Sequence, residues 1–458
     1  MTATTGDWKK QTLPIVVPRA TDDTVNREWL LARQEAFHWR HLRGGDVTAR
    51  YVDHSVEIIG YGGFGLVFKA RTIASPTEQL AVKMIFTKDS NKQAVAELRS
   101  LLYLQRLGAC HNNLVCYRDH FSATLGFTFV AAVGAFSRQL RSEKKLLSTD
   151  VGYFIETVFL NGRTMAEDVE TTDLTRELRS YAQVLRIITD LVHALAFMHE
   201  HQFAHLDIKP DNVMILNNGT DSVLLDVGLG CRPVPGDQTA GACRSERFGT
   251  TLYFAPTRAL ATYGLSPYKV MTKELYFAFD VYGLGLTIYD WGRGFVSYVE
   301  KMTVNQALDP EHHPGGRLPA PPYWPAEQDS EMGSLNSLLA AMLTYNDAAR
   351  ITAPQALALC SRFIKEFIDS SDNPDSDTPM RSSLRSRMHP GGVTVDGRPP
   401  GPGAVPAKPR HGTYITDEPP SPQAPTATTI VYGTLPPQPL TEQQKKRRLE
   451  STDVDEDA

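Results

Sequence analysis

The chain has 458 residues, of which 41% are hydrophobic and 22% are charged, so it can build a sizeable core and is not disordered throughout. Its net charge of -5 excludes a globally basic protein that binds nucleic acid through its overall field. The five cysteines are an odd number without a C-x-x-C pair, which is more typical of reduced thiols in a reducing compartment than of a disulfide framework or a zinc site. They are Cys110, Cys116, Cys231, Cys243 and Cys360.

The start of the chain and its longest apolar run predict no membrane segment. No apolar stretch comes after a charged start at Met1, so no signal peptide is visible. The longest apolar run, Leu125–Phe136, is too short to span a bilayer and predicts a buried strand. We therefore expect a soluble intracellular protein that does not bind membranes.

Residues 1–49 predict an N-terminal extension. The first part is polar, and the aromatic residues Trp29, Phe37 and Trp39 then indicate a short helix that packs on the domain after it.

Residues 50–370 predict one domain with two halves. Short β-branched runs separated by glycine-rich or polar turns predict strands at Val56–Ile59, Leu66–Ala70 and Leu80–Ile85 in the first half, about 50–160. The second half, about 161–370, shows mainly helical periodicity.

Two helices are indicated by apolar residues on one face. The first is predicted over Ser90–Leu107, and the second directly precedes His205. Their apolar faces consist of Ala94, Leu98, Leu101 and Leu104, and of Val184, Ile188, Leu191, Leu195 and Met198.

Residues 371–458 contain 15 of the 30 prolines and no periodic apolar pattern, which predicts a disordered, proline-rich tail. The basic run Lys445–Arg448 is either a nuclear import signal or a solvated charge cluster. Whether the tail docks other proteins or inhibits the domain stays open.

Glycines at Gly60, Gly62, Gly63 and Gly65 lie between two predicted strands, where a backbone can approach phosphate oxygens closely. On its own this pattern is more often a simple turn. A dinucleotide fold is disfavoured because the next element is a strand and not a helix.

A lysine inside an apolar strand is costly unless its ammonium is paired. Lys83 is such a residue, and Glu97 in the next helix is its candidate partner. A lysine held in this way can present its charge to nucleotide phosphates. The alternatives are a strand-edge lysine that reaches water and a solvated glutamate.

The segment His205–Ile215 concentrates acidic, basic and amide groups between apolar residues. Asp207 can orient the proton of an attacking hydroxyl, and Lys209 can neutralise charge on a transferred phosphoryl group. Asn212 can bind a divalent cation through its amide oxygen, and Asp226 ends a later apolar strand where it can bind the same metal. Their order and spacing make a set of unrelated turn residues a poor explanation.

These motifs, in this order, resemble those of eukaryotic-type protein kinases over about residues 52–367. The resemblance implies an α+β, bilobal fold with a small β-rich N-lobe and a larger α-helical C-lobe. It also implies the use of ATP and Mg²⁺.

The resemblance assigns a role to each residue. Lys83 would contact the nucleotide phosphates and pair with Glu97, Asp207 would be the catalytic base, and Asn212 and Asp226 would hold magnesium. The implied nucleotide-binding residues are Ile59, Gly60, Gly62, Gly63, Gly65, Val67, Ala81, Lys83, Glu156 and Met214. Among these, Glu156 resembles the start of the hinge that binds the adenine edge.

The acceptor class and a bracing residue are implied by the same resemblance. Lys209 and the segment 249–256, with Thr250 able to bond Asp207, are similar to the serine/threonine type, so we expect protein substrates with Ser or Thr acceptors. Asp280 resembles the buried helix residue that braces the catalytic loop.

Three positions depart from the family pattern. Leu206 replaces the usual arginine before the catalytic aspartate, which removes the cationic partner of a phosphorylated activation segment. Val227 replaces a phenylalanine, and Thr257 replaces a glutamate, so Arg350 is expected to be exposed or to pair with a different acid.

Two alternatives to an active divergent Ser/Thr kinase stay open, the first because of these departures and the second because it shares the aspartate–asparagine loop. One is a pseudokinase that serves as a nucleotide-binding or interaction module. The other is a small-molecule kinase, which the peptide-shaping segment 249–256 disfavours. Residues 122–150 exceed the usual connection between strands, and we interpret them as a solvated loop rather than a docking site.

Overall fold

The computed structural model describes residues 22–43, 45–61, 65–85, 92–138, 145–171, 181–217, 219–233, 243, 250, 253–262, 271–293 and 330–369. The predicted tail 371–458, including Lys445–Arg448, and the glycines Gly62 and Gly63 lie outside these residues.

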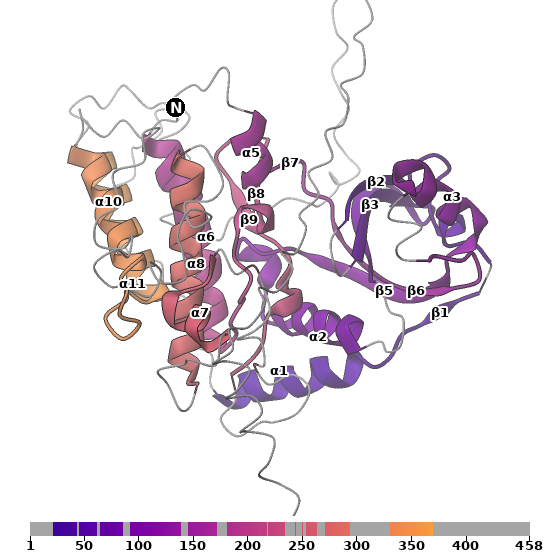
Figure 1. Cartoon of the computed structure of the whole chain (residues 1–458), viewed down its shortest axis with the longest axis horizontal. Helices are drawn as coiled ribbons and strands as arrows, with labels where there is room; N and C mark the ends of the chain where they lie inside the picture. The colour runs from indigo at the N-terminus through magenta and orange to yellow at the C-terminus, as the bar shows by residue number, and fades with distance from the viewer. Residues whose placement is uncertain are drawn as a thin grey trace, which may run out of the picture. The chain divides into compact units, whose positions relative to one another are not determined.

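Within the described residues, the N-terminal part forms a six-stranded sheet in the order β1-β5-β6-β4-β3-β2 (Figure 1). All neighbours in this sheet are antiparallel except β1 and β5. The strands are β1 His41–Leu42, β2 Glu57–Tyr61, β3 Gly65–Thr72, β4 Ser75–Ile85, β5 Tyr117–Thr124 and β6 Val151–Val158. The three strands predicted from β-branched runs are thus confirmed as β2, β3 and β4.

The C-terminal part is mainly helical and also contains a small sheet in the order β7-β8-β9. Its strands are β7 Gly162–Thr164, β8 Val213–Leu216 and β9 Ser222–Leu224. Its described helices are α5 Met165–Thr171, α6 Tyr181–Glu200, α7 Pro256–Thr262, α8 Lys273–Arg293, α10 Ser330–Met342 and α11 Ala353–Asp369. The expected division into a β-rich N-lobe and a helical C-lobe is confirmed.

The two faces of the large sheet serve different purposes because side chains alternate along a strand. On one face, Leu66 and Phe68 of β3 and Phe154 of β6 join a buried apolar cluster. On the other face, Val67 and Lys83 point into a pocket. This alternation decides which side chains can reach a ligand.

The N-terminal helix α1, Asp22–Glu35, packs along α2, Lys92–Arg106 (Figure 1). Its Trp29 is 6% exposed and lies edge-on to Tyr103, with ring centroids 5.1 Å apart. The Arg99 guanidinium lies 4.6 Å from the Trp29 ring centroid. The predicted helical extension is therefore confirmed, and it supports the helix that carries Glu97.

The apolar run Leu125–Phe136 is not a strand, and that prediction is wrong. Residues Gly126–Phe136 form helix α3, which packs Phe129 and Val133 into the apolar cluster of the sheet. Asp46 accepts a hydrogen bond from the backbone amide of Thr128 at 2.6 Å, so it caps the start of the helix. Gly126 has φ +78 there, and a Cβ would overlap Asp46.

Helix α3 also changes the interpretation of residues 122–150, which are not simply a solvated loop. Their helical part covers the sheet, although the side chain of Phe127 is 78% exposed. Residues 139–144 lie outside the described part.

Four of the five cysteines form disulfides, so the prediction of reduced thiols is wrong for them. Cys110 pairs with Cys116 and Cys231 pairs with Cys243, across Cα–Cα distances of 4.7 and 5.3 Å. The 3₁₀ segment Ala109–His111 turns the chain back between Cys110 and Cys116, a geometry that cysteine spacing alone does not reveal. Cys360 is a buried free thiol.

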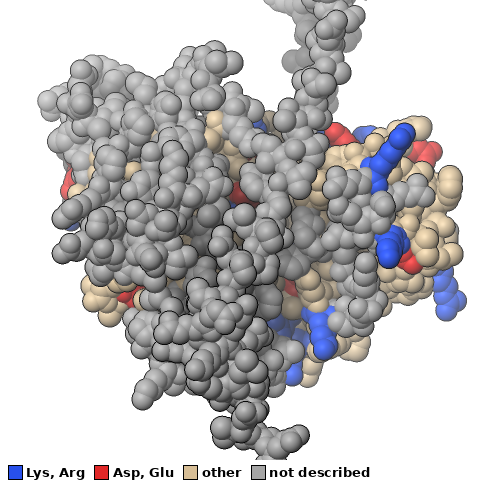
Figure 2. Space-filling view, viewed as in Figure 1, with Lys and Arg blue, Asp and Glu red and all other residues tan. Residues whose placement is uncertain are grey.

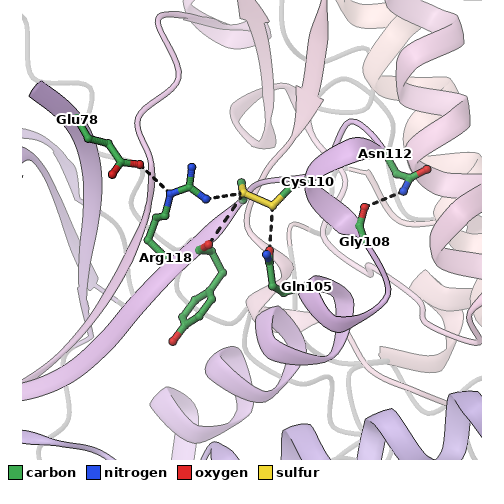
Figure 3. The surroundings of a disulfide bond; sticks show 8 residues. Glu78, Gln105, Gly108, Cys110, Asn112 and Arg118 are labelled. Carbon is green, nitrogen blue, oxygen red and sulfur yellow. Dashed lines mark hydrogen bonds and ion pairs between the residues drawn. A yellow bond between two sulfur atoms is a disulfide. The ribbon is translucent and has the colours of Figure 1, made fainter. Parts of the chain in front are cut away.

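Figure 3 shows the Cys110–Cys116 bond between the end of α2 and the start of β5. Gln105 of α2 and Arg118 of β5 both contact its sulfurs, and Arg118 also pairs with Glu78 of β4. The bond therefore closes the turn that includes the 3₁₀ segment η3, Ala109–His111.

The surface charge is mixed where the described residues are visible. Figure 2 shows blue and red side chains interspersed over the N-terminal part. Among the described residues, α6 alone is long and apolar enough to cross a bilayer, but 89% of its apolar window is buried inside the fold.

Trp29 provides a test of the contact between α1 and the domain. We expect Trp29→Ala to lower the free energy of unfolding by about 3 kcal/mol, because it removes a large buried side chain and leaves a cavity. Urea denaturation measures this change. Phe37→Ala is the matched control, because Phe37 is 61% exposed and its loss should change stability little. Equal effects of the two variants would contradict the packing of Trp29 against α2.

The cysteine pairing predicts one alkylated thiol in unreduced, denatured protein and five after reduction. Burial raises the pKa of the Cys360 thiol to about 12, so this side chain should not react in the native state. Mass spectrometry after alkylation counts the adducts. Five adducts without a reductant would contradict both disulfides.

Candidate active site

A pocket of about 270 Å³ lies between the large sheet and the C-terminal part. It brings together eight residues singled out from the sequence: Ile59, Val67, Ala81, Lys83, Glu97, Asn212, Met214 and Asp226. Its other lining residues include Leu101, Val115, Thr157 and Phe159, which the sequence analysis missed. The register of β6 on β4 places Thr157 opposite Ala81, and Phe159 follows the end of β6, where its amide donates to the backbone oxygen of Gln79 at 3.1 Å. No sequence motif marks this register.

Ile59 of β2 and Val67 of β3 line the pocket, and each lies close in sequence to one of the predicted phosphate-binding glycines. Gly60 lies next to Ile59 at the end of β2, and Gly65 begins β3. A Cβ on Gly65 would lie 2.4 Å from the backbone oxygen of Met84, so the close approach of β3 to β4 requires glycine there.

Three charged side chains from three elements meet in the pocket. The Lys83 ammonium on β4 lies 2.8 Å from a carboxylate oxygen of Glu97 on α2. It also lies 3.1 and 3.2 Å from the two carboxylate oxygens of Asp226, directly before the 3₁₀ segment η5, Val227–Leu229. The pairing of Lys83 with Glu97 that the sequence suggested is present.

The pKa values of this group depend on burial and pairing. Burial opposes the charge on Lys83, but attraction to Asp226 and Glu97 outweighs it and raises the Lys83 pKa. Burial raises the pKa of Glu97 despite Lys83, because Glu97 is 4% exposed and its Oε2 has no hydrogen-bond partner among the described residues. For Asp226, loss of water is outweighed by Lys83 and the Gly228 amide, so its pKa is lowered.

Asp280 of α8 holds the loop that carries Asp207 through hydrogen bonds to its backbone. The Asp280 carboxylate accepts hydrogen bonds from the backbone amides of His205 and Leu206, each at 2.7 Å. It also contacts His199 Nε2 at 3.1 Å. Asp280 is 2% exposed, and it occupies the bracing position expected from the sequence.

Asp207 itself is held by its neighbours in a defined orientation. One carboxylate oxygen accepts from the backbone amide and the hydroxyl of Thr250, at 3.0 and 3.1 Å. The other accepts from Asn212 Nδ2 at 3.1 Å and lies 3.4 Å from the Lys209 ammonium. Lys209 also donates to the Thr250 hydroxyl at 2.9 Å.

The two predicted metal ligands have donor atoms that fit magnesium. Asn212 and Asp226 both line the pocket, and they supply one amide and one carboxylate. Asn212 uses its amide nitrogen to bond Asp207, so its amide oxygen is the atom left to serve as a ligand. Such oxygen donors fit Mg²⁺, which takes few protein ligands and completes its shell with water and phosphate oxygens.

Glu156 does not line the pocket, and its predicted place at the adenine edge is wrong. It lies on the opposite face of β6, where Arg50 binds its carboxylate in a bidentate manner at 2.8 Å. Tyr51 also donates to it at 3.0 Å. Because side chains alternate along β6, Ile155 and Thr157 face the pocket in its place.

Arg350 has the different acid that the sequence left open. It is 5% exposed and pairs with Asp347 at 2.6 Å, while the Thr257 hydroxyl donates to the other carboxylate oxygen of Asp347. Thr257 thus reaches Arg350 through Asp347. Leu206 and Val227 are each 1% exposed and pack in the core.

The sequence matches the family model described as "Protein kinase domain" over residues 54–360. Serine/threonine-protein kinase F of Synechocystis is 26% identical over 275 residues, covering 58% of this chain and 48% of that protein. Mitogen-activated protein kinase mpkC of Aspergillus fumigatus is 24% identical over 362 residues, covering 75% of this chain and 82% of that protein. The chain spans less than half the length of the Synechocystis relative and of one from Mycoplasma pneumoniae.

Buried Glu97 predicts how the free energy of unfolding depends on pH when Lys83 is replaced by an uncharged residue. In Lys83→Met, Glu97 loses its cation, so its pKa in the folded state rises further above that in the unfolded state. The folded protein then holds more protons than the unfolded chain, and its stability falls as pH rises. We expect the loss relative to wild type to be larger at pH 8 than at pH 5 by about 1–2 kcal/mol.

Urea denaturation at the two pH values measures this difference. Lys69→Met on the adjacent strand is the matched control, because Lys69 is 3.7 Å from Glu57, whose side chain is 67% exposed. Its effect should be small and independent of pH. A loss in Lys83→Met that does not change with pH would contradict the assignment of a buried ionised pair.

Proposed function

This chain belongs to the protein kinase family, and we propose that it is an active serine/threonine protein kinase that transfers the γ-phosphoryl group of Mg-ATP to protein hydroxyls. The observation that supports this proposal most is the Lys83–Glu97 pair beside a pocket that also holds Asn212 and Asp226. A protein kinase needs such a lysine–glutamate pair and a metal-binding aspartate for phosphoryl transfer.

Binding of the nucleotide uses the two halves of the pocket. Apolar side chains Val67, Ala81 and Met214 would enclose the adenine, and the Lys83 ammonium would offset phosphate charge. Asn212 and Asp226 would hold magnesium, which neutralises charge on the phosphate oxygens when it is bound.

Transfer to the acceptor uses the loop beside the pocket. The Asp207 carboxylate orients the acceptor O–H and takes its proton as the oxygen attacks the γ-phosphorus and ADP leaves. The Lys209 ammonium balances charge on the phosphoryl group in transit. Thr250 and Asn212 fix the carboxylate, so that little reorientation is needed during the reaction.

The acceptor class is proposed from the contact between Lys209 and Thr250. This contact joins the catalytic loop to the segment before α7, on the side where a peptide would lie. Two relatives named above are serine/threonine or mitogen-activated protein kinases, which favours Ser and Thr acceptors in protein substrates.

A pseudokinase is the second candidate, and the changes at Leu206, Val227 and Thr257 favour it. None of these residues is among the groups proposed to bind phosphate, metal or the acceptor hydroxyl. A protein that binds ATP but transfers no phosphate to itself or to any protein would establish this second function.

Replacement of Asp207 tests the proposed function. We expect Asp207→Asn to lower kcat by about 10²- to 10⁴-fold, because the amide keeps the shape of the side chain but cannot accept the proton. Transfer of labelled γ-phosphate from Mg-ATP to generic basic proteins measures the rate. Analysis of the labelled residues should find phosphoserine and phosphothreonine.

Asp53→Asn is the matched control, because Asp53 is exposed in the turn before β2. It should retain wild-type activity. Equal labelling by wild type and Asp207→Asn would indicate a contaminating kinase, and label on small alcohols alone would indicate a small-molecule kinase.

A further inference from the structure

A buried arginine outside the known motifs contacts the backbone next to Asp207. Arg258 lies in α7, is 4% exposed, and donates through Nη1 to the backbone oxygen of Leu206 at 2.9 Å. Its guanidinium carbon is 3.8 Å from the ring centroid of Phe254. The carbonyl that accepts this bond belongs to the peptide that joins Leu206 to Asp207.

Leu206 adopts a backbone conformation that needs support. Its φ is +66, in the left-handed region that leucine rarely occupies. Its amide donates to Asp280 and its carbonyl accepts from Arg258, so a charged side chain holds each side of the residue. Charge-assisted hydrogen bonds of this kind are stronger than neutral ones.

Arg258 and Asp207 also face the same small space. They line a cavity of about 10 Å³ together with Thr250 and Asp280. A shift of the Leu206 peptide would therefore move the Asp207 carboxylate relative to Thr250.

We propose that Arg258 is a positioning residue for Asp207. It clamps the Leu206 carbonyl and links α7, at the end of the segment that faces a protein substrate, to the catalytic loop. The planar guanidinium suits this task because its donors are fixed relative to one another. This contact does not require a phosphorylated activation segment. Arg258 binds the backbone of residue 206, where the leucine side chain is buried and has no charge to bind a phosphate. The inference rests on the proposed function.

The test compares Arg258→Met and Arg258→Lys in the full chain. We expect Arg258→Met to lower kcat about 10- to 100-fold through misplacement of Asp207, with the KM for ATP unchanged because the nucleotide pocket is separate. Arg258→Lys keeps the charge and one donor, so it should recover part of the lost kcat. Thermal unfolding of each variant shows how much stability is lost.

Arg362→Met is the matched control, because Arg362 lies on α11 with its side chain 60% exposed. It should behave as wild type. If Arg258→Met does not fold, Phe254→Leu removes the ring beside the guanidinium and should lower kcat by a smaller factor. Wild-type kcat in Arg258→Met would overturn the proposal. So would equal losses in the Met and Lys variants that only track their thermal stability.

Hydrogen exchange separates this proposal from the proposed function. If the wild type transfers no phosphate, the proposed function fails, but the clamp still predicts faster amide exchange at residues 205–208 in Arg258→Met. Exchange in α11 should not change. Unchanged exchange at 205–208 would overturn the clamp whether or not the wild type is active.

Discussion

The ammonium of Lys83, whose side chain is only 20% exposed, sets the arrangement of the candidate active site. A charge in this environment must be paired, and removal of one partner leaves the others at high cost. Lys83 belongs to the sheet, Glu97 to α2, and Asp226 to the loop before η5. The Lys83 ammonium therefore fixes the positions of these three elements relative to one another. The packing of α1 against α2 further stabilises the helix that carries Glu97.

The departures from the family pattern change residues but retain buried contacts. Where a glutamate would pair directly with Arg350, Thr257 and Asp347 share that task. At Leu206 the apolar side chain fills the core, and Asp280 and Arg258 bind its two backbone groups. The cost of an unpaired buried polar group explains why Arg350 pairs with Asp347 where Thr257 replaces the glutamate.

The sequence allowed prediction of the elements whose signals are local. The β-branched run of β3 and the apolar periodicity of α2 and α6 were sufficient because each depends on residues close together in the sequence. Leu125–Phe136 was misread because a short apolar run fits strand and helix equally, and its cap, Asp46, lies far away in the sequence. Glu156 was misplaced because a motif does not show which face of a strand a side chain occupies. The two disulfides were missed because each needs two cysteine Cα atoms about 5 Å apart, at 4.7 and 5.3 Å, and cysteine spacing does not reveal that distance.

The energetic cost of several residues in the site helps to choose between an enzyme that transfers phosphate and a module that only binds nucleotide. Leu206 and Asp226 both have positive φ, and Glu97 is ionisable, buried and has a raised pKa. Each of these features costs stability, and such costs concentrate where function requires them. A binding module would need the pocket but not a strained backbone beside Asp207. The strain at Leu206 lies on the acceptor side, next to the group that would take the proton, and this location favours phosphoryl transfer over nucleotide binding alone.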